Sequence, residues 1–433
     1  MNRPNLNDIP LTAADCFMLA LEKQHIRRTG LSNNTCRYLL ELNGNLNAGA
    51  LREKVNNHPD LLWLASILPV KRHPFAIPHW KKQAQPLPIP VGEYTTDELI
   101  PEAMVNARIT SHNPPFLRFD VLHRAGGNSA IVFSWHHLLM DGYGAVLLLR
   151  QLATTEAWPR LELAEAQQPR RMPLAQLTNA TRAKFFVDRI SHKPLTTIAP
   201  QTTSPQGYQK IRIVRFNPQE TQQIDTIGPS LGAQFGRSPL YLACTARGVN
   251  TLLQRRGIPT HDLWIPVPRD QRKKGAKGPL VGNHLSFLFY RLQKQILASL
   301  HDTVKAINGQ MVEQIRSRMF ADYDILMNYL RRTPSPLYYY WIKGPQGGSL
   351  ASFLFTVAAD HPDDFTTFAG HSITDSWSFP SNIYPPGLTF AFMRYRDCLH
   401  LMILYFDDVL TTTELDQLEK KIRHELITGT EAS

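Results

Sequence analysis

Two adjacent histidines in the stretch SWHHLLMDGYG, residues 134–144, are the side chains best suited to acid–base chemistry. An imidazole titrates near neutral pH, so it can take a proton from an alcohol or amine and return it later. The strand-like alternation before the pair puts His136 and His137 on opposite faces of a sheet. Gly142 and Gly144 follow and favour a tight turn into a helix. We therefore expect one histidine in a cleft and the other held in packing.

Three other motifs fit their chemistry less well. GYGAVL follows a strand and opens a helix like a dinucleotide fingerprint, but position 147 is Leu instead of the third glycine. GGSLA at 347–351 resembles a nucleophile elbow and ends in Ala351 instead of glycine. The segment 360–375 holds two histidines and several carboxylates without the helical spacing of a zinc site, and we expect a solvated loop there. No metal site is predicted.

The elements that would position the histidines alternate between strands and helices in both halves of the chain. In the first half, a helix capped by Thr12, a strand at 35–46 and two strands at 115–124 and 129–137 precede the helix that follows the motif. Proline, glutamine and threonine then accumulate. We divide the chain into an N-terminal lobe (1–165), a connector (166–207) and a C-terminal lobe (208–433). Within the connector, TRAKFFVDRISH is a short basic amphipathic helix, for which packing between lobes is favoured over membrane contact.

Composition describes a soluble globular chain. Its positive charge indicates an anionic partner or surface, and a basic surface that serves solubility alone is the favoured alternative to any single partner. Of the 433 residues, 43% are hydrophobic and 19% charged, and the formal net charge is +11. The sequence shows no zinc-finger, RRM or helix-turn-helix signature, so nucleic acid is not a predicted partner. The four cysteines are far apart, which indicates a reduced compartment. Without a signal peptide or a bilayer-length apolar run, we expect a cytoplasmic protein, with the inner membrane surface as an alternative location.

The motif HHLLMDG resembles the H-H-x-x-x-D-G motif of the thioester-dependent acyltransferase superfamily. This group includes nonribosomal peptide condensation domains, wax ester synthase/diacylglycerol acyltransferases, polyketide-associated acyltransferases and chloramphenicol acetyltransferase. Residues 11–24 resemble the first helix of wax ester synthases, and 40–61 resemble a strand–helix module shared with condensation domains. Residues 265–292 resemble a wax-synthase-like segment with an Arg in a Pro-Val context before Gly-Asn and a Ser-bearing strand. No D-F-G-W-G follows, which disfavours plant-type acyltransferases.

The resemblance implies an α/β fold with two chloramphenicol-acetyltransferase-like lobes, mixed sheets with helices, and an active-site tunnel at their interface. It makes His137 the general base, with Gly142 in the same motif and His136 as structural support. It implies that Asp141 orients the loop by pairing with an arginine, for which Arg269 is the candidate. Two further positions match residues near the tunnel and would bind substrate, although capping of the loop and strand is an equal alternative: Asn283 and Ser286.

The function implied is transfer of an acyl group from a coenzyme A or acyl-carrier-protein thioester to a hydroxyl, without an acyl-enzyme. Such ester formation would serve lipid or secondary-metabolite biosynthesis. The donor's phosphopantetheine would be a co-substrate, no bound cofactor is expected, and the acceptor would be a small molecule or lipid. The basic segment 269–278 is a candidate docking loop for the acidic carrier or the coenzyme's phosphates. Alternatives are an amide-forming, free-standing condensation enzyme and a non-catalytic relative that binds a carrier protein or lipid.

Overall fold

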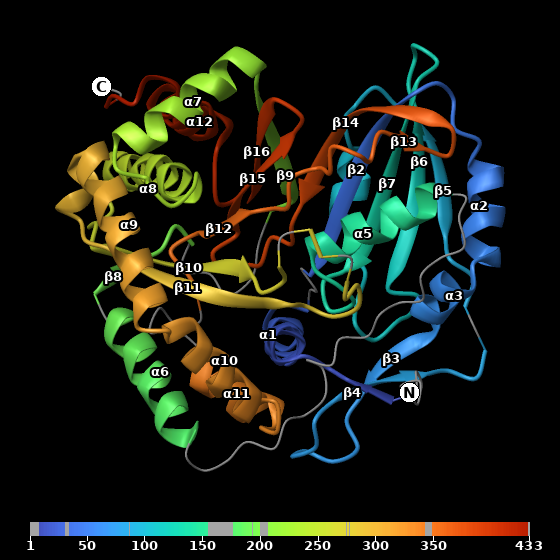
Figure 1. The fold of residues 1–433 in the computed structure, drawn as a ribbon, viewed down its shortest axis with the longest axis horizontal. Helices are drawn as coiled ribbons and strands as arrows, with labels where there is room; N and C mark the ends of the chain where they lie inside the picture. The colour runs from blue at the N-terminus through green and yellow to red at the C-terminus, as the bar shows by residue number, and fades with distance from the viewer. Residues whose placement is uncertain are drawn as a thin grey trace.

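The computed structural model describes residues 8–30, 34–85, 87–154, 176–192, 194–199, 207–273, 275–276, 278–342 and 349–431. Two lobes stand side by side, and helix α1 (Ala13–Thr29) lies between them near their base (Figure 1). Thr12 caps this helix as predicted. Its side chain accepts a hydrogen bond from the Asp15 backbone, and the Asp15 carboxylate accepts one from the Thr12 backbone in return. The sequence therefore fixes the start of α1 locally.

A six-stranded sheet forms the centre of the first lobe. All neighbours in it are antiparallel except β5 and β6, and α5 (Gly142–Ala153) contacts β2 and β13. In spatial order the strands are β13 (Thr367–Phe368), β14 (His371–Phe379), β2 (Thr35–Asn43), β7 (Ser129–His136), β6 (Leu117–His123) and β5 (Val91–Thr95). Helices and small strands at its edge and base are α2 (Ala48–Asn57), α3 (Pro59–Ser66), α4 (Glu102–Asn106), β1 (Asp8–Pro10), β3 (Ile67–Val70) and β4 (His79–Lys82).

Strand β14 corrects one expectation. The segment 360–375 was expected to be a solvated loop throughout, yet its last residues begin a strand that pairs with β2. Five consecutive residues at the end of this strand, from Asp375 to Phe379, are buried. Serine, threonine and aspartate give this strand a polar sequence that does not predict a buried strand. Its burial depends on pairing with a strand more than 300 residues earlier, which the local sequence does not reveal. The chain thus crosses back to complete the first lobe's sheet.

The second lobe holds two sheets with helices around them (Figure 1). The larger contains, in order, β12 (Leu354–Val357), β15 (Leu388–Tyr395), β16 (Cys398–Phe406) and β9 (Gln209–Phe216); the smaller contains β11 (Leu285–Leu292), β10 (Asp262–Asp270) and β8 (Leu195–Thr196). Packed with them are α6 (Leu177–Ile190), α7 (Pro218–Ser230), α8 (Ser238–Arg255), the 3₁₀ turn Ile296–Ala298, α9 (Leu300–Arg316), α10 (Met319–Leu330), α11 (Ser335–Ile342) and α12 (Thr412–Thr428).

Two buried hydrophobic cores correspond to this arrangement. One joins the first lobe's sheet with α1 and α10, and the other fills the space between the second lobe's larger sheet and helices α8, α9 and α12. The fold therefore confirms the predicted α/β class with two lobes and mixed sheets. Within the described part of the chain, no helix has the length and apolar character needed to cross a membrane.

Candidate active site

The motif loop leaves the end of β7 and returns directly into α5. All eight residues of β7 are buried, which anchors the loop at its start. At its end, Asp141 caps α5 by accepting a hydrogen bond from the Gly144 backbone at 2.9 Å. Between these points the Trp135 indole donates to the Met140 carbonyl at 2.8 Å. The loop is thus held at both ends and braced across its middle.

His136 points into the interior of the protein. Its Nδ1 accepts a hydrogen bond from the Leu138 backbone at 3.1 Å, so its Nε2 carries the proton and donates to Glu22 Oε1 at 2.8 Å. The two side chains are 1% and 0% exposed. With both ring nitrogens engaged away from solvent, His136 holds the end of β7 against α1 and has no atom free to meet a substrate.

His137 faces a cavity and is half-buried. Its backbone is held on both sides, because its N–H donates to the Asn34 carbonyl and its carbonyl accepts from Asn283 Nδ2, each at 2.7 Å. Its Nδ1 is buried. Burial is the main cause that lowers the pKa of this imidazole below its usual value, which favours the neutral, proton-accepting form.

The cavity beside His137 has a volume of about 400 Å³ and a predominantly apolar wall. Side chains from α1, both strands of the β10–β11 pair and α10 make one continuous part of this wall: Phe17, Met18, Leu21, Trp264, Phe287, Phe289, Tyr323 and Leu326. Segments near the seam between the lobes add Phe379, Ser381 and Thr389. The cavity is therefore built by both lobes, and His137 is the imidazole that the motif places in its wall.

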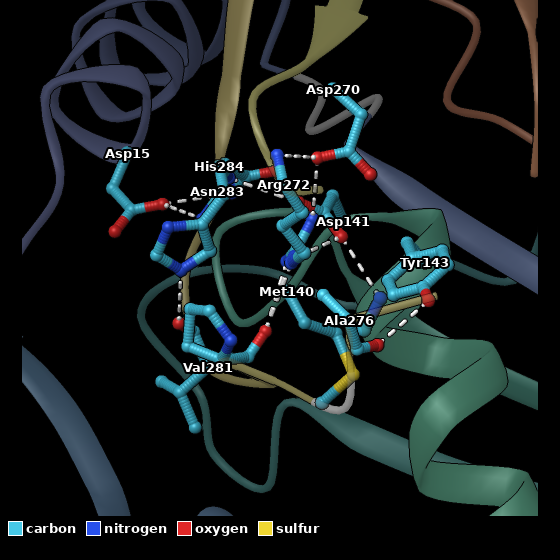
Figure 2. A network of polar contacts seen from close by, with 12 residues as sticks. Asp15, Met140, Asp141, Tyr143, Asp270, Arg272, Ala276, Val281, Asn283 and His284 are labelled. Carbon is cyan, nitrogen blue, oxygen red and sulfur yellow. Dashed lines mark hydrogen bonds and ion pairs between the residues drawn. The ribbon is translucent and has the colours of Figure 1, made fainter. Parts of the chain in front are cut away.

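Asp141 is the centre of a polar network shown in Figure 2. Arg272 meets its carboxylate with both terminal nitrogens, Nη1 to Oδ2 at 2.9 Å and Nη2 to Oδ1 at 3.1 Å. The His284 backbone also donates to Oδ2 at 2.9 Å. The Arg272 guanidinium in turn donates to the Pro279 carbonyl and to Asp270. Both oxygens of the carboxylate therefore have hydrogen-bond partners within the protein, and Asp141 acts by holding the loop in place.

The prediction that Arg269 pairs with Asp141 is wrong. Arg269 lies near the end of β10, opposite Ser286 in the ladder, and its guanidinium stands 4.9 Å from the centre of the Phe320 ring. It is exposed and contributes to the cavity wall. Arg272 follows after the strand has ended, where the chain is free to turn toward the motif. The arginine partner exists, three residues further along than expected.

The connection from β10 to β11 closes on the motif loop (Figure 2). The Gly282 backbone donates to the Leu139 carbonyl at 2.8 Å, and Gly282 forms a parallel bridge with Met140. Tyr143 donates its hydroxyl to the Ala276 carbonyl at 2.7 Å. This connection was predicted as a docking loop. Its described residues join the second lobe to the motif loop of the first. Docking of a carrier protein or of coenzyme A phosphates on this connection stays a prediction.

Asn283 and Ser286 are placed beside the cavity wall and are not part of its lining. Asn283 donates from both its backbone and its side chain to Asp15 Oδ1, each at 2.8 Å, as well as to the His137 carbonyl. Ser286 is buried, and its hydroxyl donates to the Phe320 carbonyl at 3.4 Å. Among the two roles left open for these residues, the geometry favours the structural one. Substrate contact stays a prediction.

Two residues of α1 belong to the site without having been predicted. Asp15 supports Asn283, and Glu22 supports His136, so one helix braces both histidines. Burial raises the pKa of the Asp15 carboxyl. The capping pattern Thr-x-x-Asp could have drawn attention to Asp15 as a fixed position, and Glu22 is an acid that directly follows an apolar run at 17–21. Neither signal indicates a contact with the motif.

No family model matches the chain, and no curated protein sequence matches it. Solved structures do match along nearly its whole length. The first condensation domain of the calcium-dependent antibiotic synthetase, in complex with a substrate analogue, has a TM-score of 0.67 at 15% identity and covers 98% of both chains. The condensation domain of the Monacolin K polyketide synthase MokA has 0.66 at 12%, and polyketide synthase associated protein 5 from Mycobacterium tuberculosis has 0.62 at 15%, with 98% of each chain covered.

The class that these neighbours define is that of two-lobed condensation domains and polyketide-associated proteins. The chain has their fold, which confirms the resemblance stated from the sequence at the level of the fold. At 12–15% identity the likeness concerns architecture, and the chemistry has to be argued from the site itself.

Proposed function

We propose that this protein is an acyltransferase that moves an acyl group from a thioester to a hydroxyl, with His137 as general base. The observation that carries the proposal is the setting of His137, whose ring stands in the wall of an apolar cavity between two lobes and has a lowered pKa. A neutral imidazole held by its own backbone in such a place is suited to accept a proton. Because Nδ1 is buried, Nε2 is the nitrogen that would meet the acceptor.

The reaction proceeds in one addition and one elimination. His137 takes the proton from the acceptor hydroxyl while the oxygen attacks the thioester carbonyl, which gives a tetrahedral intermediate and an imidazolium. The intermediate collapses, the carbon–sulfur bond breaks, and the departing thiolate takes the proton back from the imidazolium. The products are an ester and a free thiol, the imidazole is neutral again, and no group of the protein is acylated.

The donor in this proposal is acyl-coenzyme A or an acylated carrier protein. Both present a phosphopantetheine arm and negative charge, and the chain's net charge of +11 would attract either. The largely apolar cavity wall supports an acyl group or acceptor with hydrocarbon character. An amine acceptor would follow the same steps and give an amide. Identifying the product as an ester or an amide therefore shows which acceptor the protein uses.

The test is a screen of acyl-coenzyme A and acyl-carrier donors against pooled alcohols and amines, read by product mass. Wild-type protein should form an ester, and His137→Ala should lower the rate by roughly 10²–10⁴-fold with unchanged unfolding behaviour. His301→Ala, at an exposed histidine far from the motif, is the matched control. Full turnover in His137→Ala would reject the base assignment. Amide products alone would reject ester formation, and binding of donors without any product would show a non-catalytic relative.

A further inference from the structure

Exposed large hydrophobic side chains gather along one edge of the molecule. They come from three segments, the β3–β4 hairpin, helix α6 and helix α11, which lie along the lower edge of Figure 1. The side chains and their exposed fractions are Val70 39%, Phe75 63%, Leu177 49%, Phe185 70%, Leu337 46%, Tyr340 64% and Trp341 47%. We call this set the apolar edge. Large apolar side chains grouped on a surface mark an interaction site more often than scattered ones do.

Contacts connect the three segments to one another. Lys71, in the β3–β4 turn, donates to the Thr333 carbonyl at 3.0 Å, just before α11. Arg182 of α6 forms an ion pair with Asp322 of α10, the helix that leads into α11. The hairpin, α6 and α11 are therefore tied to one another through α10 and the turn that follows it.

Each of the two helices of the apolar edge packs one side against the protein and exposes large apolar side chains on the other side. In α11, Tyr338 and Tyr339 are 2% and 5% exposed, while Tyr340 and Trp341 face outward. In α6, Ala183 is fully buried against the lobe, and Phe185 is among the most exposed hydrophobic residues of the described chain. These aromatic rings are thus presented by firmly seated helices.

The charges beside the apolar edge are mainly basic. Four exposed arginines accompany the aromatic residues: Arg72, Arg182, Arg189 and Arg332. Two of the basic groups are balanced by acids, because Asp188 pairs with Lys184 and Asp322 pairs with Arg182. The basic character of the edge therefore comes from its other arginines. Tryptophan and tyrosine with flanking arginines are the residues that settle at the headgroup level of a bilayer, where rings have one apolar and one wet side.

The cavity beside His137 reaches this same edge. Lys184, Val187 and Asp188 of α6 line it together with Trp341 and Ile342 of α11. Trp341 is at once part of the cavity wall and half exposed. We infer that the apolar edge docks on an anionic lipid bilayer, so that the cavity opens toward the bilayer between α6 and α11. Delivery of an apolar substrate through this mouth rests on the proposed function, whereas docking does not.

The first experiment is co-sedimentation of the full chain with phosphatidylcholine vesicles, with and without phosphatidylglycerol. We expect binding to the anionic vesicles, weakened by added salt. The triple variant Phe75→Ser, Phe185→Ser and Tyr340→Ser should bind roughly tenfold or more weakly, because three rings lose their burial in the interface. The matched control replaces three aromatic residues that are 39%, 65% and 60% exposed and lie outside the edge: Tyr94→Ser, Tyr208→Ser and Phe235→Ser.

A second measurement tests the depth and orientation of docking. Brominated lipids quench nearby tryptophan, so vesicles that carry them should quench part of the protein's fluorescence, and Trp341→Phe should abolish that part. Absence of binding to anionic vesicles, or an equal loss in the control triple, would overturn the inference. So would edge-dependent binding to an acidic carrier protein in place of vesicles. His137→Ala should bind vesicles like wild type, which separates a failure of docking from a failure of acyl transfer.

Discussion

Arg272 and Asp141 form a two-pronged ion pair that ties the second lobe to the motif of the first. The guanidinium is 4% and the carboxylate 11% exposed. The same carboxylate caps α5 and accepts the His284 backbone, so one side chain joins a helix start, a clasping loop and a cation from the other lobe. The aspartate of the motif is thereby explained without any contact to substrate.

Replacing Arg272 by methionine should destabilise the protein by about 3 kcal/mol. The change leaves a mostly buried carboxylate without its counter-charge, which is the costly way to break such a pair. The measurement is the free energy of unfolding in urea. Arg269→Met is the matched control, since its exposed guanidinium stacks on Phe320 without an ion pair to Asp141, and its effect should stay within about 0.5 kcal/mol. Equal losses in the two variants would contradict the assignment.

The rate of acyl transfer should fall in acid with a midpoint below pH 6.5. Only neutral His137 can accept a proton, and burial lowers the pKa of this imidazole from its usual 6.5. Activity should therefore be complete above pH 6.5 and be lost as the pH falls through the lowered value. A kcat/KM profile of the wild-type protein measures the midpoint. A midpoint at or above 6.5, or the same acid limb in the residual rate of His137→Ala, would show that another group titrates.

Asp15→Ala should lower kcat while KM changes little, and should cost about 1–3 kcal/mol of stability. Asp15 does not touch the cavity, but it holds Asn283, which in turn holds the His137 carbonyl. Without it, two donors of Asn283 lose their acceptor and the histidine backbone is free to shift. Steady-state kinetics and urea unfolding read the two effects. Asp302→Ala removes an exposed acid from the first turn of α9, and a similar kcat loss there would exclude a positioning role for Asp15.

Local patterns predicted the motif's position and the elements on either side of it. Thr12 starts α1 through its own capping contacts, and the alternation before His136 sets the face of each histidine. The start of the helix and the faces of the histidines therefore depend only on residues close in the sequence. The partner of Asp141 could not be predicted in the same way. Arg269 and Arg272 are three residues apart in one basic segment, and only the end of β10 between them decides which guanidinium turns toward the motif.

Long-range pairing accounts for the other misses. Strand β14 is rich in polar residues and is buried by pairing with β2 in the first lobe's sheet, a contact with a strand more than 300 residues earlier that no window of sequence contains. The sequence of residues 101–115 also favours a helix ended by its prolines, yet only α4 forms. The chain beyond Asn106 packs near β2 instead, where the Ile109 backbone donates to the Thr35 hydroxyl at 2.9 Å. The bracing role of Glu22 likewise depends on a residue 114 positions away.

The two glycines of the motif should respond differently to alanine. A Cβ on Gly144 would stand 2.5 Å from the Leu280 carbonyl oxygen, so the clasping loop would have to move. A Cβ on Gly142 would meet no atom within 4 Å. Both residues lie in the first turn of α5, where alanine is otherwise the better helix former. Gly144→Ala should therefore cost about 1–3 kcal/mol in urea unfolding, whereas Gly142→Ala should be neutral or slightly stabilising. If Gly144→Ala unfolded like wild type, the loop would not be packed against the helix as described.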